Sequence, residues 1–369
     1  MSSSGHVSPQ PRRSQEEESA PGESSKTPPA VITNAQVDTI PAPHIEAGDD
    51  HDGSDDGYDT ASIESSTASL SSSVMAGVWE HGRRYNKFRE GQYVLPNDEG
   101  EQNREDMKHA MTVMLMDGAL HFADIGEHPQ NIIDLGTGTG IWALDVADKY
   151  PSALVEGLDL SPIQPSWVAP NAKFVIDDVE DPWTYPTDHF DLVHLRVLTA
   201  HMKNIPKLFD QSYNSDNFRH LKPGAWIEIQ DHENTFYCDD GSMPEDYTPK
   251  QMFSYVQQGL ALFGKDTTAM LSVDDKLVAA GFTNITHRIF KLPVGPWAKD
   301  KKQKMLGLFW RTIIMDGLQG IALGILGRAL KWSPEEVEVY LVDIRKQMMR
   351  KDIHTYWPYH VVTAQKPLT

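Results

Sequence analysis

The chain has 369 residues and a formal net charge of −20, a length that predicts one elaborated domain or one domain with a tail. The negative charge argues against direct binding to nucleic acid or to an anionic membrane, because both partners attract clustered Lys and Arg. The single cysteine, Cys238, excludes an internal disulfide and indicates a reducing compartment.

The first predicted feature is a tail over residues 1–78 that is rich in Ser, Pro, Asp and Glu. Its scattered aliphatic residues bury too little apolar surface to offset the conformational entropy lost on ordering. We therefore expect a disordered tail followed by one folded domain over residues 79–369. The polar start, MSSSGHVSPQPRRSQ, lacks the apolar region of a signal peptide, so a cytoplasmic location is expected, with the nucleus as an alternative.

After the tail, a helix is predicted from about Gln102 to Leu120, with Asn97 or Asp98 positioned to cap its start. Short apolar runs then alternate with amphipathic segments, which predicts a core sheet at about 130–240. The runs predicted to form strands are QNIIDLG, ALVEGLDLS, AKFVIDDVED, FDLVHLRVL and GAWIEIQD. Alternating strands and helices imply a parallel sheet with helices on both faces.

The last third of the chain, residues 241–369, is predicted to form a helical cap and two final antiparallel strands. The run SPEE, which begins at Ser333, supplies an N-cap, a first-turn proline and a capping-box acid for a helix that runs to about Lys351. The most apolar segment, about Met305 to Leu330, is interrupted by charged residues. It therefore predicts buried or lid helices over the substrate and no membrane span.

Three alternating glycines, Gly136, Gly138 and Gly140, follow the first core strand and precede a helix. Backbone N–H groups at such a turn can approach a ligand without a Cβ in the way. The dinucleotide-binding fingerprint G-x-G-x-x-G differs from this spacing, because here the third glycine comes one residue early. The spacing therefore disfavours a nicotinamide oxidoreductase.

Asp134 strengthens this distinction, because it lies at the end of the strand just before the glycine turn. A pyrophosphate in the turn would bring negative charge close to this carboxylate in a partly desolvated site, which is unfavourable. A ligand that carries positive charge and no phosphate removes the conflict. S-adenosylmethionine, which bears an ammonium and a sulfonium, is such a ligand.

Two further acids follow the next strands along the chain. Asp159 ends the second core strand, where a carboxylate can accept hydrogen bonds from both ribose hydroxyls of an adenosine ligand. Asp178 follows the third core strand, where it can accept from the adenine amine. Each acid alone also fits a structural role as a helix cap, a turn residue or a solvated loop residue. Together with Asp134, however, they predict an S-adenosylmethionine site.

Several segments of the chain are similar to one known family. They are GRRYNKFREGQYVLPNDEGEQNRED, DLGTGTGIWALDVADKYPSALVEGLDLSPIQPSW, IDDVEDPW, FDLVHLR, LKPGAWIEIQD and IHTYWPYHVVTAQKP. From about Glu80 to Pro367 the chain resembles the fungal LaeA-like (UMTA) methyltransferases. The resemblance implies S-adenosyl-L-methionine as cofactor and an α/β class I methyltransferase fold, Rossmann-like, with helices on both faces of a seven-stranded sheet and an extra helical lid. It also implies that strands at about 283–292 and 359–365 form an antiparallel edge.

The expected cofactor-binding residues combine the glycine turn with the strand-end acids and their neighbours. They are Asp134, Gly136, Thr137, Gly138, Gly140, Asp159, Leu160, Asp178, Val179 and Arg196. Arg196 is expected to pair with the donor carboxylate or with Asp134, and a surface ion pair is the alternative. The sequence has no closely spaced ligand set of the HExxH kind, so no metal is expected.

Methyl transfer from a sulfonium depends mainly on positioning the reactants and excluding water. An oxygen acceptor would gain from a general base, whereas a thiolate or an amine needs none. His201, past the fourth core strand, and His232, past the fifth, are the candidate bases. The alternative for both histidines is ordinary loop polarity.

The leading hypothesis is an S-adenosylmethionine-dependent methyltransferase that acts on a small-molecule acceptor in fungal secondary metabolism. The alternative is a LaeA-like regulatory methyltransferase subunit that acts through protein partners in the control of secondary metabolism and development. The Ser-rich tail is compatible with regulation by phosphorylation, although such tails are often inert. The two hypotheses share the donor site and differ in the acceptor.

Overall fold

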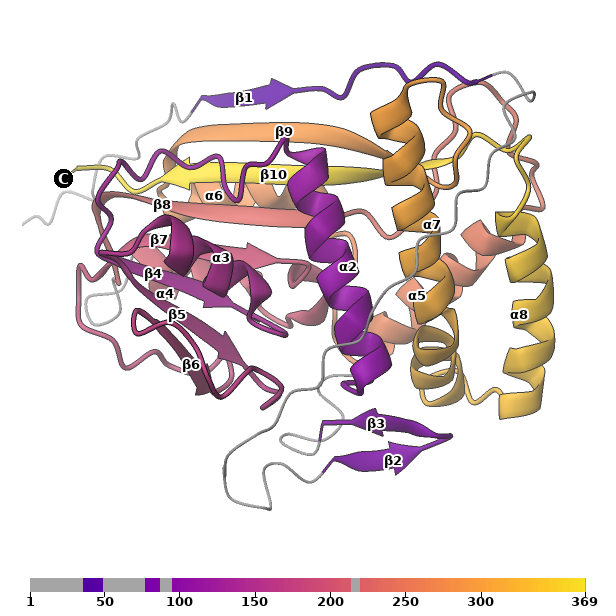
Figure 1. Cartoon of the computed structure of the whole chain (residues 1–369), viewed down its shortest axis with the longest axis horizontal. Helices are drawn as coiled ribbons and strands as arrows, with labels where there is room; N and C mark the ends of the chain where they lie inside the picture. Colours follow the sequence, from indigo (N-terminus) through magenta and orange to yellow (C-terminus); the bar gives the residue numbers. More distant parts are fainter. Residues whose placement is uncertain (1–35, 49–76, 87–94, 214–219, 369) are drawn as a thin grey trace, which may run out of the picture. The chain divides into compact units, whose positions relative to one another are not determined.

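The computed structural model describes residues 36–48, 77–86, 95–213 and 220–368. These residues form an eight-stranded sheet with helices on both faces and a separate two-stranded sheet (Figure 1). The strands are β1 (Val37–Ile40), β2 (Val78–Glu80), β3 (Arg83–Tyr85), β4 (Asn131–Leu135), β5 (Leu154–Asp159), β6 (Ala172–Ile176), β7 (Phe190–Arg196), β8 (Leu221–His232), β9 (Thr283–Pro293) and β10 (Tyr356–Gln365). The helices are α2 (Glu99–Leu115), α3 (Ile141–Lys149), η1 (Thr199–His201), α4 (Ile205–Tyr213), α5 (Thr248–Leu262), η2 (Ala269–Ser272), α6 (Val273–Ala280), α7 (Lys301–Ala322), η3 (Leu323–Gly327) and α8 (Pro334–Met348).

The strand order of the large sheet is β1-β9-β10-β8-β7-β4-β5-β6. The five strands from β4 to β8 pair in parallel, as the alternating strands and helices of the sequence predict. β10 runs antiparallel to both β8 and β9, which confirms the expected antiparallel pairing of the last two strands. Because the carboxyl ends of parallel strands share one edge, the segments after β4, β5, β6 and β7 all begin at that edge.

The strand β1 corrects the prediction that residues 1–78 are disordered throughout. It pairs in parallel with β9, with Val37 opposite Ile285, and the side chain of Val37 packs against one of the core clusters. Without β1, β9 would be an edge strand with a row of unpaired backbone groups. The sheet therefore has one strand more than the predicted seven, and β1 rather than β9 forms its edge. Most of the predicted tail, residues 1–35 and 49–76, lies outside the described residues.

The core strands send alternate side chains to opposite faces of the sheet, since successive residues of a strand point in opposite directions. Ile133 of β4 belongs to a core cluster that includes side chains of α4 and α6. Its neighbour Ile132 packs in a different cluster with Trp142 of α3. The two faces are therefore both covered, which is the arrangement expected for a parallel sheet.

A further apolar core joins α2, α5, α7 and α8 to β10, and Figure 1 shows these helices beside one another. Asp98 caps α2 by accepting a hydrogen bond from a backbone N–H of its first turn, which confirms one of the two predicted caps. α8 opens with the predicted capping box of Ser333 and Glu336. The segment Lys301–Gly327 has the length and apolar composition of a membrane span, but a buried core helix meets the same criteria, and α7 packs in this core.

Candidate functional site

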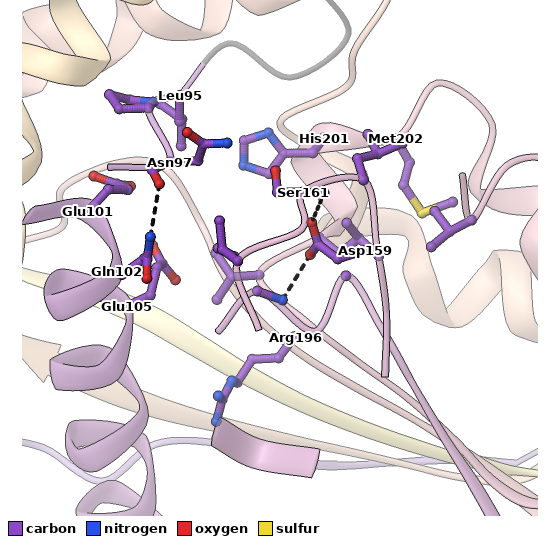
Figure 2. A pocket seen from close by; sticks show the side chains of 18 of the residues that line it. Leu95, Asn97, Glu101, Gln102, Glu105, Asp159, Ser161, Arg196, His201 and Met202 are labelled. Atoms are coloured by element: carbon purple, nitrogen blue, oxygen red, sulfur yellow. Dashed lines mark hydrogen bonds between the residues drawn. The ribbon is translucent and has the colours of Figure 1, made fainter. Parts of the chain in front are cut away.

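A pocket lies at the carboxyl edge of the parallel strands, between the glycine turn and α2 (Figure 2). Its lining residues are Leu95, Pro96, Asn97, Glu101, Gln102, Glu105, Lys108, Gly136, Gly138, Asp159, Leu160, Ser161, Ile163, Asp178, Val179, Glu180, Arg196, Val197, Leu198, His201 and Met202. The predicted site residues among them are Gly136, Gly138, Asp159, Leu160, Asp178, Val179, Arg196 and His201. Residues from four predicted strand ends therefore line one pocket.

The other predicted residues, Asp134, Thr137, Gly140 and His232, are not among those that line this pocket. Asp134 is buried and both of its oxygens have protein donors: Thr137 Oγ1 lies 2.6 Å from Oδ2, and His194 Nδ1 lies 2.7 Å from Oδ1. Asp134 and Thr137 therefore hold the glycine turn from within the protein. Asp134 was expected to bind the cofactor, but its side chain does not line the pocket.

The glycines of the turn have different surroundings. Gly138 has a φ of 59°, and a Cβ built on it would meet no atom within 4 Å, so its surface faces open space at the pocket. Gly140 has a φ of 85°, and a Cβ there would lie 2.4 Å from the ring of Phe174. Both positions need the left-handed backbone that favours glycine. Gly138 thus opens the pocket to a ligand, whereas Gly140 allows α3 to start close to β6.

Asp159 lies between the glycine turn and the segment after β5. One of its carboxylate oxygens accepts from the backbone N–H of Gly138 at 2.8 Å, and the other accepts from the N–H of Ser161 at 2.8 Å. Burial raises the pKa of Asp159 to about 6, although both N–H groups favour the ionised form. Each oxygen keeps acceptor capacity for a ligand hydroxyl.

Asp178 lies at the corresponding place after β6 and is also buried. Its Oδ1 accepts from the backbone N–H of Glu180 at 2.9 Å, which fixes the local turn. Asp159 and Asp178 come from adjacent strands, since β5 pairs with β6. Two acceptors on neighbouring strand ends suit a ligand with donors at both ends of a nucleoside.

Arg196, at the end of β7, has a partner that the sequence prediction did not include. Its Nη1 donates to Nδ1 of His109 at 3.0 Å, and Nε2 of His109 in turn donates to Asp145 at 2.9 Å. Burial and the neighbouring guanidinium of Arg196 lower the pKa of His109, so this ring is neutral and accepts at Nδ1. Arg196 is thereby held at the pocket by α2 and α3 instead of pairing with Asp134.

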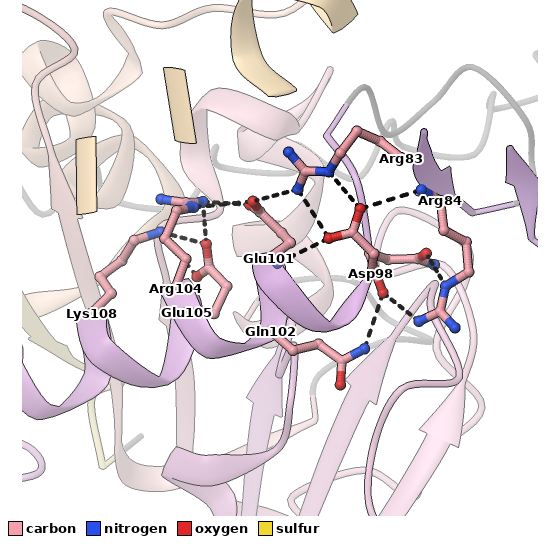
Figure 3. Close-up of polar contacts among 9 residues, drawn as sticks. Arg83, Arg84, Asp98, Glu101, Gln102, Arg104, Glu105 and Lys108 are labelled. Atoms are coloured by element: carbon pink, nitrogen blue, oxygen red, sulfur yellow. Dashed lines mark hydrogen bonds and ion pairs between the residues drawn. The ribbon is translucent and has the colours of Figure 1, made fainter. Parts of the chain in front are cut away.

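The α2 wall of the pocket was missed by the sequence reasoning. Arg104 Nη2 contacts Glu101 Oε1 at 2.5 Å and Glu105 Oε1 at 2.6 Å, while Lys108 Nζ donates to Glu105 at 2.7 and 2.9 Å (Figure 3). Burial acts to raise the pKa of Glu105, but Lys108 and Arg104 lower it to about 2. Glu105 is therefore an ionised carboxylate at the pocket wall.

A signal for this wall exists in the sequence. Glu101, Arg104, Glu105 and Lys108 are spaced three or four residues apart, which places them on one face of a helix. Such a stripe usually marks a solvated surface, and only the packing of α2 against α7 shows that it is partly enclosed. Among the other lining residues that were not predicted, Ser161, Glu180 and Val197 are adjacent in the chain to a predicted position or one residue from it, whereas Leu95 and Pro96 precede α2.

The two candidate bases differ in position. His201 lines the pocket, and burial, with Lys265 and Lys108 nearby, lowers its pKa to about 3. His232 packs instead between Trp310 and Trp357, with ring centroids 5.1 and 5.2 Å away, and burial lowers its pKa to about 3 as well. Both rings are neutral at pH 7 and weakly basic, so His232 is a core residue and His201 a poor general base.

No residue of α7 is among the residues that line the pocket, so the apolar segment expected to cover the substrate serves mainly as core packing. In the part of the chain that the structure describes, no group of three or more His, Cys, Asp or Glu side chains is arranged to hold a metal ion. The pocket combines carboxylates and two cationic side chains with apolar ones such as Leu160, Val179 and Leu198.

Comparisons with known proteins identify the family of the chain. A family model described as a methyltransferase domain matches residues 105–286. Methyltransferase pytC of Aspergillus terreus is 39% identical over 305 residues, which cover 82% of this chain and 92% of pytC. Protein-methionine methyltransferase laeA of Emericella nidulans is 35% identical over 301 residues, which cover 78% of this chain and 76% of laeA. The chain belongs to the fungal LaeA-like methyltransferase family.

Another LaeA-like relative, secondary metabolism regulator LAE1 of Cochliobolus heterostrophus, is 34% identical over 78% of this chain and 94% of its own length. As a LaeA-like methyltransferase, the chain is an enzyme that uses S-adenosylmethionine. The nicotinamide alternative is thereby excluded. The acceptor of a LaeA-like methyltransferase is a small molecule or a protein.

Proposed function

We propose that this enzyme transfers the methyl group of S-adenosylmethionine to a small-molecule acceptor in fungal secondary metabolism. The observation that carries the donor part is that Asp159 and Asp178 line one pocket beside the open face of Gly138. The acceptor part is supported by the similarity to pytC, whose whole length is nearly covered by the match. The bound donor supplies an activated methyl group on its sulfonium.

Residues of the β5 and β6 ends suit the adenosine half of the donor. The carboxylate of Asp159 would accept from the ribose hydroxyls, and Asp178 would accept from the adenine amine. Leu160 and Val179 lie next to these acids and offer apolar contact to the base. Gly138 contributes a surface without a Cβ, so the ligand can approach the backbone closely.

Residues of α2 and β7 suit the methionine half. Glu105 is an ionised carboxylate at the wall and can attract the ammonium group, while Arg196 can meet the donor carboxylate. These opposite charges would hold the donor at both ends of its amino acid portion. Their main contribution to rate would be orientation for an in-line transfer, since the donor carries its own activation.

The acceptor side of the pocket contains Leu198, His201 and Met202. Because the pKa of His201 is lowered to about 3, this ring offers little help in removing a proton from an alcohol or phenol. The site therefore favours an acceptor atom that is nucleophilic without a strong base, such as an amine, a thiolate, a thioether or an already ionised enol.

A second candidate function is methylation of a protein, in a regulatory role with protein partners. It is favoured by the names of the relatives laeA and LAE1, which are a protein-methionine methyltransferase and a secondary metabolism regulator. A thioether acceptor is also compatible with a site that lacks a strong base.

The experiment that tests both candidates is incubation with methyl-labelled S-adenosylmethionine and a fungal extract split into metabolite and protein fractions. Label in the metabolite fraction supports the proposed function, and label in a protein band supports the regulatory candidate. D159N should abolish either transfer, whereas D246N, at an exposed acid away from the pocket, should not. Full labelling by D159N would contradict the proposed donor site.

A further inference from the structure

The imidazole of His194 touches both ends of the glycine turn. His194 lies in β7, directly opposite Asp134 in the sheet register, and has no exposed surface. Its Nδ1 lies 2.7 Å from Asp134 Oδ1, just before the turn. Its ring stacks on Trp142 of α3, just after the turn, with centroids 3.6 Å apart and planes 5° from parallel.

The contact with Asp134 continues into the turn itself. The second oxygen of Asp134 accepts from the hydroxyl of Thr137 at 2.6 Å, so a chain of two hydrogen bonds runs from His194 to the middle of the turn. The turn needs this support because its glycines, with positive φ, have large conformational freedom when they are not held. Gly138, the next residue, forms the open surface of the pocket.

The protons of this chain can be placed from the donors and acceptors alone. The Thr137 hydroxyl donates to Asp134, and an ionised Asp134 can only accept, so His194 donates from Nδ1. Its Nε2 is buried and has no hydrogen-bond partner among the described residues. The hydrogen bond between the ring and the turn therefore runs through Nδ1.

The nearest buried acid on the neighbouring strand does not change this assignment. Glu228 lies opposite His194 in the register of β7 and β8 and is fully buried. One of its oxygens accepts from the backbone N–H groups of Phe122 and Ala123, and the other accepts from the amide of Gln230. The carboxylate of Glu228 therefore holds the loop after α2 in place through these hydrogen bonds.

We propose that His194 is a positioning residue for donor binding, which acts through Asp134 and Thr137 to hold the glycine turn in its open form. The proposal rests on the proposed function, because it takes the pocket to be the donor site. It also explains how an acid before the glycine turn can matter without facing the ligand. The carboxylate of Asp134 is stabilised by two hydrogen-bond donors and maintains the conformation of the turn.

The test compares two replacements at the same buried position. In H194N the side-chain amide nitrogen can occupy the place of Nδ1 and donate to Asp134, whereas H194L has no donor. H194L should bind S-adenosylhomocysteine about tenfold or more weakly by calorimetry, and H194N should stay within about threefold of the wild type. Both variants leave a gap beside Trp142, so both should lower the melting temperature.

A merely structural role predicts a different pattern, in which H194N and H194L lower donor affinity equally or not at all. H220L is the matched control, because His220 is also buried but its Nδ1 bonds to Pro186 O away from the turn. It should reduce stability and leave donor affinity unchanged. If H194L does not fold, T137V removes the hydrogen bond at the other end of the chain, between Thr137 and Asp134. It should lower donor affinity to a similar degree.

Hydrogen exchange of the ligand-free enzyme separates this proposal from the proposed function. Backbone N–H groups of residues 136–140 should exchange faster in H194L and T137V than in the wild type and H194N. If the four proteins show these exchange rates but the wild type binds no adenosyl ligand, the proposed function is overturned and the role of His194 is not. Equal exchange in all four proteins would overturn the role of His194, whatever the ligand.

Discussion

The backbone N–H of Gly138 donates a hydrogen bond of 2.8 Å to the carboxylate of Asp159, and this bond joins the glycine turn to the end of β5. An acid and a glycine that are 21 residues apart in the chain therefore form one surface of the pocket. A change in the charge of Asp159 should consequently alter the affinity of any ligand that contacts Gly138.

Donor affinity should depend on pH through Asp159. Burial raises the pKa of this carboxyl to about 6, and ribose hydroxyls donate to the ionised form. Affinity should therefore be constant above about pH 6 and weaken by up to about tenfold per pH unit below it. Calorimetry with S-adenosylhomocysteine across this range measures the effect. D159N should bind weakly with no such pH dependence, and a wild-type affinity that is flat from about pH 5 to pH 8 would contradict the assignment.

Acid should destabilise the fold through His232. Burial lowers the pKa of this ring to about 3, against about 6.5 in the unfolded chain, so the unfolded state binds more protons between these values. The stability contribution of the neutral ring is thus present above about pH 6.5 and is lost as the pH falls. H232F keeps an aromatic ring between Trp310 and Trp357 and should reduce the loss by up to about 1.4 kcal/mol per pH unit.

Urea unfolding at about pH 7 and about pH 5 measures this difference. The exposed His128 provides the control, since H128N should leave the pH dependence of unfolding as it is in the wild type. If wild type and H232F lose the same free energy of unfolding on acidification, His232 does not make the contribution assigned to it.

Substitutions at Glu105 and Lys108 should change stability and donor binding separately. E105Q leaves the buried side chains of Lys108 and Arg104 with a weaker partner, so it should lower the free energy of unfolding by roughly 1–3 kcal/mol and weaken donor binding. E105Q/K108M removes both charges and should recover most of the stability without recovering donor affinity. Recovery of both properties would show that Glu105 does not contact the donor.

Alanine substitutions at Gly138 and Gly140 should affect donor binding and stability to different degrees. G138A places a methyl group in open space at the pocket, so it should cost about 1–2 kcal/mol for its positive φ and strongly impair donor binding. G140A drives a methyl group into Phe174 and should destabilise the fold more than G138A does. G118A is the control, because Gly118 also has a positive φ and open surroundings but does not line the pocket.

Thermal unfolding and calorimetry on the same preparations distinguish these variants. A G138A protein that binds the donor as tightly as G118A would show that the open face of the turn is not the donor surface.

The sequence was sufficient to predict the core strands and the glycine turn. Each core strand is a short apolar run, and all of them except FDLVHLR end at or beside an acid or a glycine, so this local pattern predicts both the strand and the place of its last residue. Asp159 and Asp178 could therefore be assigned to one edge of the sheet from their positions in the chain. The caps of α2 and α8 were predictable for the same reason, since Asp98 and Ser333 bond to backbone within three residues.

The remaining features depend on partners that are distant in the chain. Asp134 is enclosed because His194 lies 60 residues away on the adjacent strand, and no local pattern reports that pairing. β1 has only four residues, and its strand conformation depends on the free edge of β9. Glu105 and its charged neighbours are spaced as on the exposed face of a surface helix, and only the packing of α2 places Glu105 at the pocket.

The parallel pairing of β1 with β9 has a practical consequence for recombinant work on this enzyme. A shortened protein that starts at residue 79, where the sequence alone would place the domain boundary, would strip β1 from the sheet and bare the backbone of Ile285 and its neighbours. Such an edge readily recruits a strand from another molecule, so the trimmed enzyme should self-associate as its concentration rises, whereas a version that begins before Val37 should not.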